Sequence, residues 1–295
     1  MISRSNPVIS SRAVDFLLAT QDASGGWAYG RAQTPCVEAT SAAMLALMHE
    51  QNAIAASRRG LAWLEAAQNP DGGWGFCVGD TESGWATAWA LLALGPMSEN
   101  SNAVRRARDW LKDTPVYHTL DDKLQAEYQR IASIDLSLRG WPWLPAQASW
   151  VEPTALAILA LSRWPDEGRV AEAMQYLSDR RCRGGGWNVG NPIMLGAQLP
   201  PRAVPTALVL LALSGPAPER SMNEDLQALR DDMRGDGGAL ALAWGLVALH
   251  AHETDDSAGA KLLAELQGAD GGWNGNPYQT SIAILAQKDL SWLNR

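Results

Sequence analysis

The feature that most constrains this chain is a glycine turn that ends in tryptophan and recurs along its whole length. The turns are Gly25-Gly26-Trp27, Gly72-Gly73-Trp74, Gly140-Trp141, Gly185-Gly186-Trp187 and Gly271-Gly272-Trp273. A helical segment rich in alanine and leucine follows each turn, and polar helical segments precede most of them. Recurrence at intervals of roughly 20 to 50 residues is typical of an array of supersecondary units. The sequence therefore predicts repeated units of helix, glycine turn and helix.

The second helix of each unit is apolar on nearly every face, and a helix of that kind is buried. Examples are the segments Ala42 to Leu47, Leu91 to Leu94, Ile158 to Leu161 and Leu210 to Leu213. The fifth unit is degenerate, with Ala239 where tryptophan would stand, and the sixth ends with Thr280 to Leu285. An open superhelix would leave one long side of the buried helices uncovered, whereas a closed ring covers them all. The predicted fold is all-α, an (α/α)6 toroid of six inner and six outer helices, with an open solenoid as the alternative.

One toroid domain is expected to span residues 1–295, with insertions near 113–138 and 189–201. The predicted outer helices are Ser11–Thr20, Ala53–Gln68, Asn102–Lys112, Asp166–Arg180, Glu219–Met233 and Asp256–Gln267. Their predicted N-caps are Ser11, Asp166 and Asp256. The first insertion has room for a helix near Leu120–Arg130, and the prolines of the second predict irregular structure.

Composition narrows the classes of partner. The formal net charge is −8, and no basic stripe is present to neutralise phosphates, so nucleic acid and anionic membrane surfaces are disfavoured. No apolar run approaches the roughly 20 residues that span a bilayer, and we expect a cytoplasmic protein that is not an integral membrane protein. Cys36, Cys77 and Cys182 have no CxxC spacing, so neither a disulfide framework nor a zinc ribbon is expected.

The segment from Arg58 to Trp74 resembles the QW motif of terpene cyclases and of protein prenyltransferase β subunits. It reads RRGLAWLEAAQNPDGGW, and related units extend from about Arg12 to Leu290. The chain thus resembles the prenyltransferase/squalene oxidase repeat superfamily, including the squalene-hopene and oxidosqualene cyclases. This resemblance implies an α/α toroid and an isoprenoid ligand.

Two carboxyl groups lie two residues before the threonine that opens an inner helix. They are Glu38, in Val37-Glu38-Ala39-Thr40, and Glu152, in Val151-Glu152-Pro153-Thr154. A first-turn carboxyl lies at the positive end of the helix dipole, where the ring opens. In class II terpene cyclases the proton-donating aspartate has the same offset from its threonine, so the resemblance implies a catalytic acid at Glu152, with Glu38 as a second candidate. The chain has glutamate there and lacks the flanking aspartates.

Aromatic usage points to an apolar or cationic ligand, since the chain has 14 Trp but only 2 Phe. Electron-rich ring faces stabilise carbocations. Trp85 and Trp89 share one face of the second inner helix, and Trp244 on the fifth is expected opposite them. The candidate substrate-binding residues are Trp85, Trp89, Trp150, Trp244 and Tyr278.

No metal or other cofactor is expected. The Asp-x-Cys pair of the zinc-dependent prenyltransferase β subunits is missing at Cys36 and Cys77, and Asp121-Asp122 does not continue into a DDxxD cluster. The leading hypothesis is a class II terpene cyclase-like protein that cyclises an apolar polyene after protonating it. The sequence leaves open a noncatalytic toroid that binds an isoprenoid or a protein, and a β-subunit-like component. It also leaves open pairing with another copy, a second toroid or a helical subunit.

Overall fold

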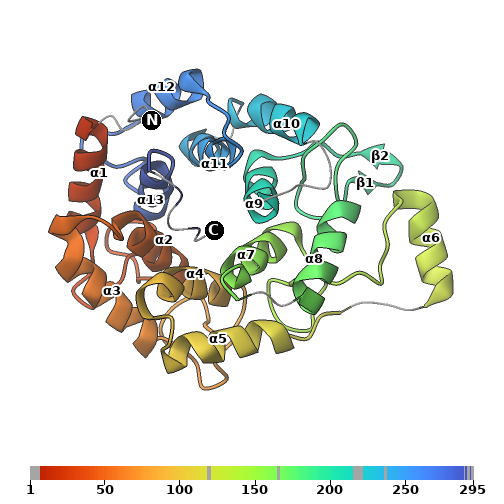
Figure 1. The fold of residues 1–295 in the computed structure, drawn as a ribbon, viewed down its shortest axis with the longest axis horizontal. Coiled ribbons are helices and arrows are strands. Elements are labelled where there is room, and N and C mark those ends of the chain that lie inside the picture. The colour runs from red at the N-terminus through yellow and green to blue at the C-terminus, as the bar shows by residue number, and fades with distance from the viewer. Residues whose placement is uncertain are drawn as a thin grey trace.

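The computed structural model describes residues 7–117, 121–164, 167–214, 222–235, 238–288, 290 and 293. Apolar helices form an inner ring and more polar helices surround them (Figure 1). The inner helices are α2 (Val37–Leu47), α4 (Ala86–Ser98), α7 (Val151–Leu161), α9 (Ala203–Leu213), α11 (Gly238–Ala251) and α13 (Pro277–Leu285). The outer helices are α1 (Pro7–Thr20), α3 (Ile54–Ala66), α5 (Asn102–Asp113), α8 (Glu167–Asp179), α10 (Asn223–Met233) and α12 (Ser257–Glu265).

The inner ring is closed. Each inner helix packs on the next in chain order, and α13 returns to pack on α2. At the seam, Arg12 of α1 donates hydrogen bonds to the carbonyl oxygens of Gly268 and Ala269 in the last turn, at 3.1 and 2.8 Å. The predicted toroid is therefore confirmed, and the open solenoid is excluded.

The same two hydrogen bonds hold every turn tryptophan. The indole N–H donates to a leucine carbonyl near the end of an outer helix, at 2.6 to 2.8 Å, and the backbone N–H donates to a threonine Oγ1 at the start of an inner helix, at 2.8 to 3.0 Å. The threonines are Thr40, Thr87, Thr154, Thr206 and Thr280. Each tryptophan thus joins an outer helix to the inner helix that follows it. This explains why tryptophan and threonine recur together and why the degenerate fifth unit has neither.

We expect Thr87→Val to destabilise the protein by about 1–3 kcal/mol, because valine keeps the shape of threonine but leaves the buried N–H of Trp74 unpaired. Urea unfolding followed by tryptophan fluorescence measures the change. Thr81→Val, in an exposed loop, is the matched control. A Thr87→Val protein as stable as the wild type would contradict this role.

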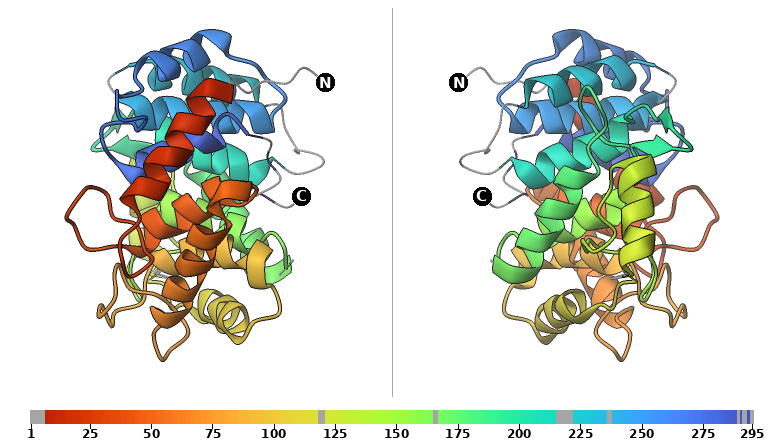
Figure 2. Two further views of the ribbon diagram at one scale, coloured as in Figure 1. Left: turned by 90° about the vertical axis from the view of Figure 1, so that its left-hand side faces the viewer. Right: turned by 90° about the vertical axis from the view of Figure 1, so that its right-hand side faces the viewer.

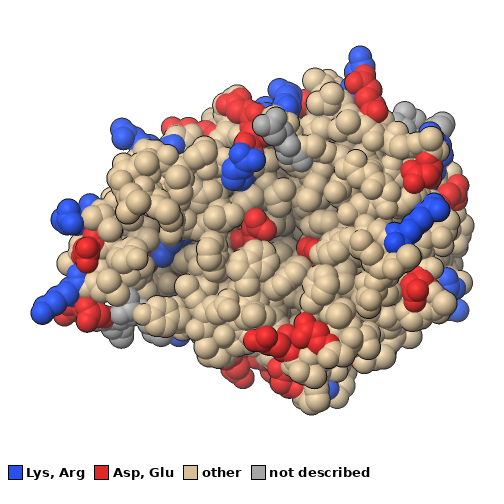
Figure 3. All heavy atoms as spheres, turned by 180° about the vertical axis from the view of Figure 1, so that it is seen from behind, with Lys and Arg blue, Asp and Glu red and all other residues tan. Residues whose placement is uncertain are grey.

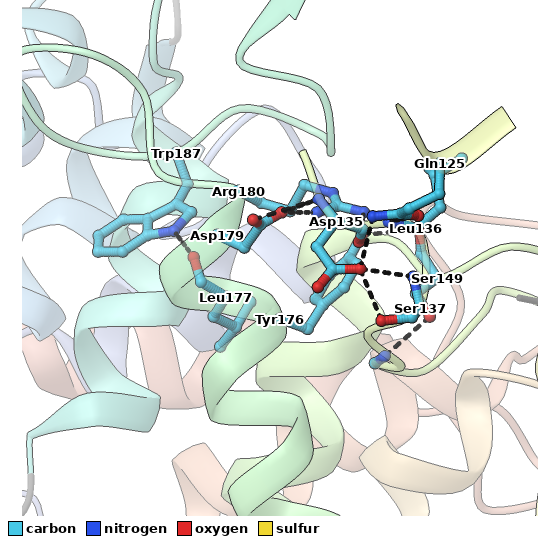
Figure 4. A network of polar contacts seen from close by, with 11 residues as sticks. Gln125, Asp135, Leu136, Ser137, Ser149, Tyr176, Leu177, Asp179, Arg180 and Trp187 are labelled. Atoms are coloured by element: carbon cyan, nitrogen blue, oxygen red, sulfur yellow. Dashed lines mark hydrogen bonds and ion pairs between the residues drawn. The ribbon is translucent and has the colours of Figure 1, made fainter. Parts of the chain in front are cut away.

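The first insertion contains α6 (Asp122–Ala132), which corresponds to the helix predicted near Leu120–Arg130 and stands outside the rings (Figures 1 and 2). A polar network fastens the chain after α6 to α8 (Figure 4). Arg180 occupies the place of the motif glutamine, donates to the carbonyl oxygen of Asp135 at 3.2 Å, and lies over the Tyr176 ring at 4.6 Å. Gln125 of α6 donates to the Asp135 carboxylate at 2.9 Å. The replacement of glutamine by arginine therefore accommodates the insertion.

The sequence predicted Ser11, Asp166 and Asp256 as the N-caps of outer helices. Helix α1 begins at Pro7, so Ser11 lies inside the helix and is not its N-cap; proline suits the first helical position. Asp256 is confirmed as an N-cap, accepting from Gly259 N at 2.9 Å. Asp166 and Glu219 lie outside the described residues.

The second insertion was predicted to be irregular. That prediction is wrong in part, because the insertion contains a short hairpin. Its strands are β1 (Ile193–Met194) and β2 (Ala197–Gln198), which pair antiparallel. Leu195 and Gly196, with φ of 49° and 80°, form the connecting turn, and two residues of positive φ suit the twist of a hairpin. The prolines flank the strands, where they remove no ladder hydrogen bond.

Candidate functional site

The loops that lead from the turn tryptophans into the inner helices gather on one face of the ring, here called the mouth face (Figure 2). One residue in or just before the first turn of each inner helix remains half-buried there, and the residue after it is buried in every helix except α13, where Gln279 is also half-buried. These residues are Glu38, Trp85, Glu152, Val204, Leu240 and Tyr278. Five of them lie two residues before the recurring threonine, and Leu240 is the counterpart in the degenerate unit. Together they form a ring around the mouth of the toroid.

Glu38 is the most strongly perturbed carboxyl group of this ring. Its Oε2 accepts a hydrogen bond from the hydroxyl of Tyr29, which precedes α2 in the same repeat. Burial, with a contribution from the charge of Glu152, raises the pKa of Glu38 to about 7, although hydrogen bonding from Tyr29 acts in the opposite direction. Burial therefore favours the protonated form of Glu38 at pH values where an ordinary glutamate is ionised.

Groups that stabilise the Glu38 anion surround this carboxyl. Tyr278 and the indole N–H of Trp89 lie close enough to lower the pKa of Glu38, although the Trp89 N–H makes no hydrogen bond of ordinary geometry to a described group. Burial and the charge of Glu38 raise the pKa of Tyr29, so its hydroxyl keeps the proton that it donates. The first turn of α2 adds the helix dipole, which favours an anion. The Glu38 side chain can thus hold a proton and also tolerate its loss.

Glu152 lies on the first turn of α7, and burial raises its pKa as well. Its side chain makes no hydrogen bond to any residue that the structure describes. The charge of Glu152 acts on Glu38 across the mouth, since α4 separates α2 from α7 in the inner ring. The two predicted carboxyl groups therefore belong to one site, but only Glu38 has donors around it.

Three aromatic side chains form a floor below the carboxyl groups. The Trp89 ring centroid lies 6.1 Å from that of Trp244 and 5.8 Å from that of Tyr278. Both tryptophans are about 1% exposed, so they meet inside the barrel and close it below the mouth. The Trp244 indole N–H donates to the Tyr278 hydroxyl at 3.4 Å. The predicted position of Trp244 opposite Trp89 is thus confirmed.

A second set of aromatic residues was not recognised in the sequence. Each lies two residues after a turn tryptophan, at Tyr29, Phe76 and Trp143. The Tyr29 ring lies 6.1 Å from that of Phe76 and 5.8 Å from that of Tyr278, and Trp143 packs on Trp85 at 5.3 Å. The fixed offset from the turn tryptophan is the signal that would have found these residues.

The remaining predicted site residues lie farther from the floor. Trp85 is half-buried at the mouth and packs on Trp143. Trp150 is 37% exposed and borders Gly190 in the second insertion, so it belongs to the rim and does not contact the floor.

The mouth face carries few charges (Figure 3). Acidic side chains lie near its centre within an otherwise uncharged surface, and most basic side chains lie toward the periphery. Within the described ranges, no group of three histidine, cysteine or acidic residues is placed to hold a metal ion. None of the described helices is long and apolar enough to cross a membrane.

A groove of about 670 Å³ lies elsewhere, against α10 on the outer wall, where Glu224, Asp231 and Asp232 contribute to its lining. Two of these acids are paired with arginines, Glu224 with Arg181 and Asp232 with Arg202. The groove contains none of the ring residues, so we place the candidate site at the mouth.

Comparison with known proteins agrees with this architecture. The family model of the squalene-hopene cyclase C-terminal domain matches residues 2–114. A protein from Actinoplanes is 18% identical, with 96% of this chain and 98% of that chain covered and a TM-score of 0.66. Type II terpene cyclase MstE from Scytonema is 17% identical, with 95% and 96% covered and a TM-score of 0.66. No curated protein sequence matches.

The same fold also occurs within a larger protein of another kind. Salmonella alpha-2-macroglobulin is 17% identical, with 98% of this chain but 18% of that chain covered and a TM-score of 0.56. Likeness at these identities establishes the fold alone. The fold and its mouth define an α/α toroid with acidic and aromatic residues at one end of the inner ring. More particularly, the α/α toroid of this chain is similar in fold to that of type II terpene cyclases.

Proposed function

We propose that the protein is a class II terpene cyclase-like enzyme that protonates an apolar polyene at the mouth of the toroid and so starts its cyclisation. The observation that carries the proposal is Glu38, a carboxyl group with a pKa of about 7 that is hydrogen-bonded to Tyr29 above an aromatic floor. A general acid works best when its pKa lies near the working pH. Glu38 meets this condition, and it faces side chains suited to an apolar ligand.

The proposed reaction needs a group that donates a proton and groups that stabilise the charges formed by that transfer. The Glu38 carboxyl gives its proton to one carbon of a terminal alkene, whose π electrons form the new C–H bond and leave a carbocation on the other carbon. The hydroxyl of Tyr29 then stabilises the carboxylate, and the faces of Trp89, Trp244 and Tyr278 stabilise the cation. Loss of a proton or capture by water ends the reaction. In this scheme Glu152 acts mainly through its charge, which raises the pKa of Glu38.

A single toroid is compatible with this function. The alignment with MstE, a type II terpene cyclase, covers 96% of the MstE chain, which supports a single toroid as the proposed enzyme. A substituted form of MstE has been solved in complex with geranylgeranyl dihydroxybenzoate as substrate, which supports an isoprenoid chain as the ligand here. Pairing with another copy or with a second subunit stays a prediction, as does a cytoplasmic location.

The first test offers the purified protein squalene, oxidosqualene, farnesyl diphosphate, geranylgeranyl diphosphate and geranylgeranyl dihydroxybenzoate. Extracts are analysed by chromatography with mass detection, and diphosphate products are dephosphorylated first. We expect a cyclised product from at least one polyene. If a folded protein binds these compounds but returns all of them unchanged, the noncatalytic binding toroid replaces the cyclase.

We expect Tyr29→Phe to lower the rate of product formation about tenfold to a hundredfold. Phenylalanine keeps the ring but removes a hydrogen bond to a charged carboxylate, which is worth about 1.5–3 kcal/mol. Tyr117→Phe is the matched control, because the Tyr117 side chain is 62% exposed. Equal rates for Tyr29→Phe and wild type would remove Tyr29 from the mechanism.

A further inference from the structure

Two cysteines from neighbouring repeats face each other beside the mouth. Cys36 directly precedes α2, and Cys77 lies in the loop that follows Trp74. The two residues pair in an isolated antiparallel β-bridge, and both thiols are free. The neighbouring hydrogen bond runs from Val37 N to Phe76 O at 3.0 Å, so Cys36 and Cys77 are the non-hydrogen-bonded pair of this bridge.

That position is geometrically suited to a disulfide. Opposed residues of a non-hydrogen-bonded pair have Cα atoms about 4.5 Å apart and side chains on the same side. Disulfides require Cα separations of about 4.4–6.8 Å. Burial is the main cause that raises the pKa of Cys36 to about 11. The charge of Cys77 contributes to this increase, so the two thiol groups lie close enough to interact.

Local hydrogen bonds hold both cysteines in this arrangement. Cys36 N donates to the carbonyl oxygen of Trp27 at 2.9 Å. The Asp80 carboxylate accepts from Phe76 N at 2.7 Å, and Asp80 N donates to the carbonyl oxygen of Cys77 at 3.1 Å. These contacts lie on both sides of the bridge and fix the backbone of both cysteines.

The geometry points to Cys36 and Cys77 as a reversible dithiol–disulfide site, oxidised by a low-molecular-weight disulfide such as oxidised glutathione. Cys77 is half-buried and lies between the exposed side chains of Phe76 and Val78, so it is the accessible thiol. Cys36 is buried and acts second. Cys182 is in another repeat and takes no part.

The exchange balances in two steps. The Cys77 thiolate attacks one sulfur of oxidised glutathione, the glutathione S–S bond breaks, and one glutathione thiolate leaves. The Cys36 thiolate then attacks the Cys77 sulfur of the mixed disulfide and releases the second glutathione. Two protein thiols are oxidised, one glutathione disulfide is reduced to two thiols, and the two cysteine protons end on the released glutathiones. The raised pKa of Cys36 keeps its thiolate scarce, which slows the second step.

The new bond would connect two repeats beside the proposed acid. Phe76, next to Cys77, stacks on Tyr29, and Tyr29 donates to Glu38 two residues after Cys36. Oxidation therefore fixes the loop that bears Phe76 against the start of α2. The disulfide itself does not depend on the proposed cyclase activity, and the test below uses no substrate.

The test equilibrates the reduced full-length protein with glutathione buffers of increasing oxidised fraction, blocks remaining thiols with N-ethylmaleimide, and maps tryptic peptides without reduction. We expect the Cys36 and Cys77 peptides to become linked and two hydrogen masses lighter, in the wild type and in Cys182→Ser alike. A protein that remains reduced in the most oxidising buffer, or that stops at glutathionylated Cys77, would overturn the proposal.

The melting temperature of the protein provides a second test. Closing the chain between residues 36 and 77 restricts the unfolded state, so the oxidised wild type should melt on the order of 5 °C above the reduced form. Cys77→Ser, checked by circular dichroism, should melt at the same temperature in both buffers. An equal shift in Cys77→Ser would assign the effect to the buffer and count against the site.

Discussion

Glu38→Gln is expected to reduce the rate of product formation by about a thousandfold or more, because it removes the proton that starts the reaction and keeps the size of the side chain. General acid catalysis contributes about 10²–10⁴-fold. Glu152→Gln should cost no more than about tenfold, since Glu152 has no surrounding donors in the described structure and acts on Glu38 by charge. Rates are measured by mass-detected product formation, normalised to protein with native circular dichroism.

The matched control is Glu82→Gln, an exposed carboxyl in a loop between Trp74 and α4, which should keep the wild-type rate. The wild-type rate should also fall as pH rises above about 7, because the reactive form of Glu38 is protonated. An inactive Glu152→Gln beside an active Glu38→Gln would transfer the role of acid to Glu152 and contradict the assignment made here.

Glu38→Gln should also stabilise the folded protein at alkaline pH. The pKa of Glu38 is about 7 in the folded protein and near 4.5 ordinarily, so the folded state binds the proton more tightly than the unfolded state. The stability that this proton contributes is complete below about pH 4.5 and is lost as pH rises to about 7. The loss amounts to at most about 3 kcal/mol of the free energy of unfolding. Glutamine does not titrate and avoids that loss.

Urea unfolding at pH 5 and pH 8 measures this difference. We expect Glu38→Gln to be more stable than wild type at pH 8 and to change less between the two pH values. Glu65→Gln, exposed on α3, serves as the control with the wild-type dependence. Parallel pH dependences for wild type and Glu38→Gln would show that Glu38 does not carry a raised pKa. Lower activity with higher stability is the combination expected of a functional residue held in an unfavourable environment.

The sequence predicted the fold well because its determinants repeat. Apolar inner helices and glycine–tryptophan turns recur along the whole chain, and one pair of hydrogen bonds from each turn tryptophan explains that recurrence. The exceptions are local. The start of α1 at Pro7 and the hairpin at Leu195-Gly196 depend on single-residue backbone preferences, which the repeat pattern does not contain.

The site could be predicted only in part from the sequence, because residues of several repeats come together to form it. The offset from the threonine identified Glu38 and Glu152, and the sequence placed Glu152 first by its resemblance to the cyclase acid. The contacts favour Glu38, and two of the three groups around its carboxyl, Trp89 and Tyr278, come from distant segments. Tyr29 precedes α2, Trp89 lies on α4, and Tyr278 lies on α13, which meets α2 only when the ring closes. No single repeat contains this arrangement.

The central claim, protonation of a polyene by Glu38, is tested most directly by running the reaction in D₂O with whichever neutral polyene gives a product. The exchangeable Glu38 carboxyl becomes deuterated, so the wild-type product should carry one carbon-bound deuterium from the initiating step, and Glu38→Gln should form no such product. A cyclised wild-type product without deuterium, or a deuterated product formed by Glu38→Gln at the wild-type rate, would contradict the account.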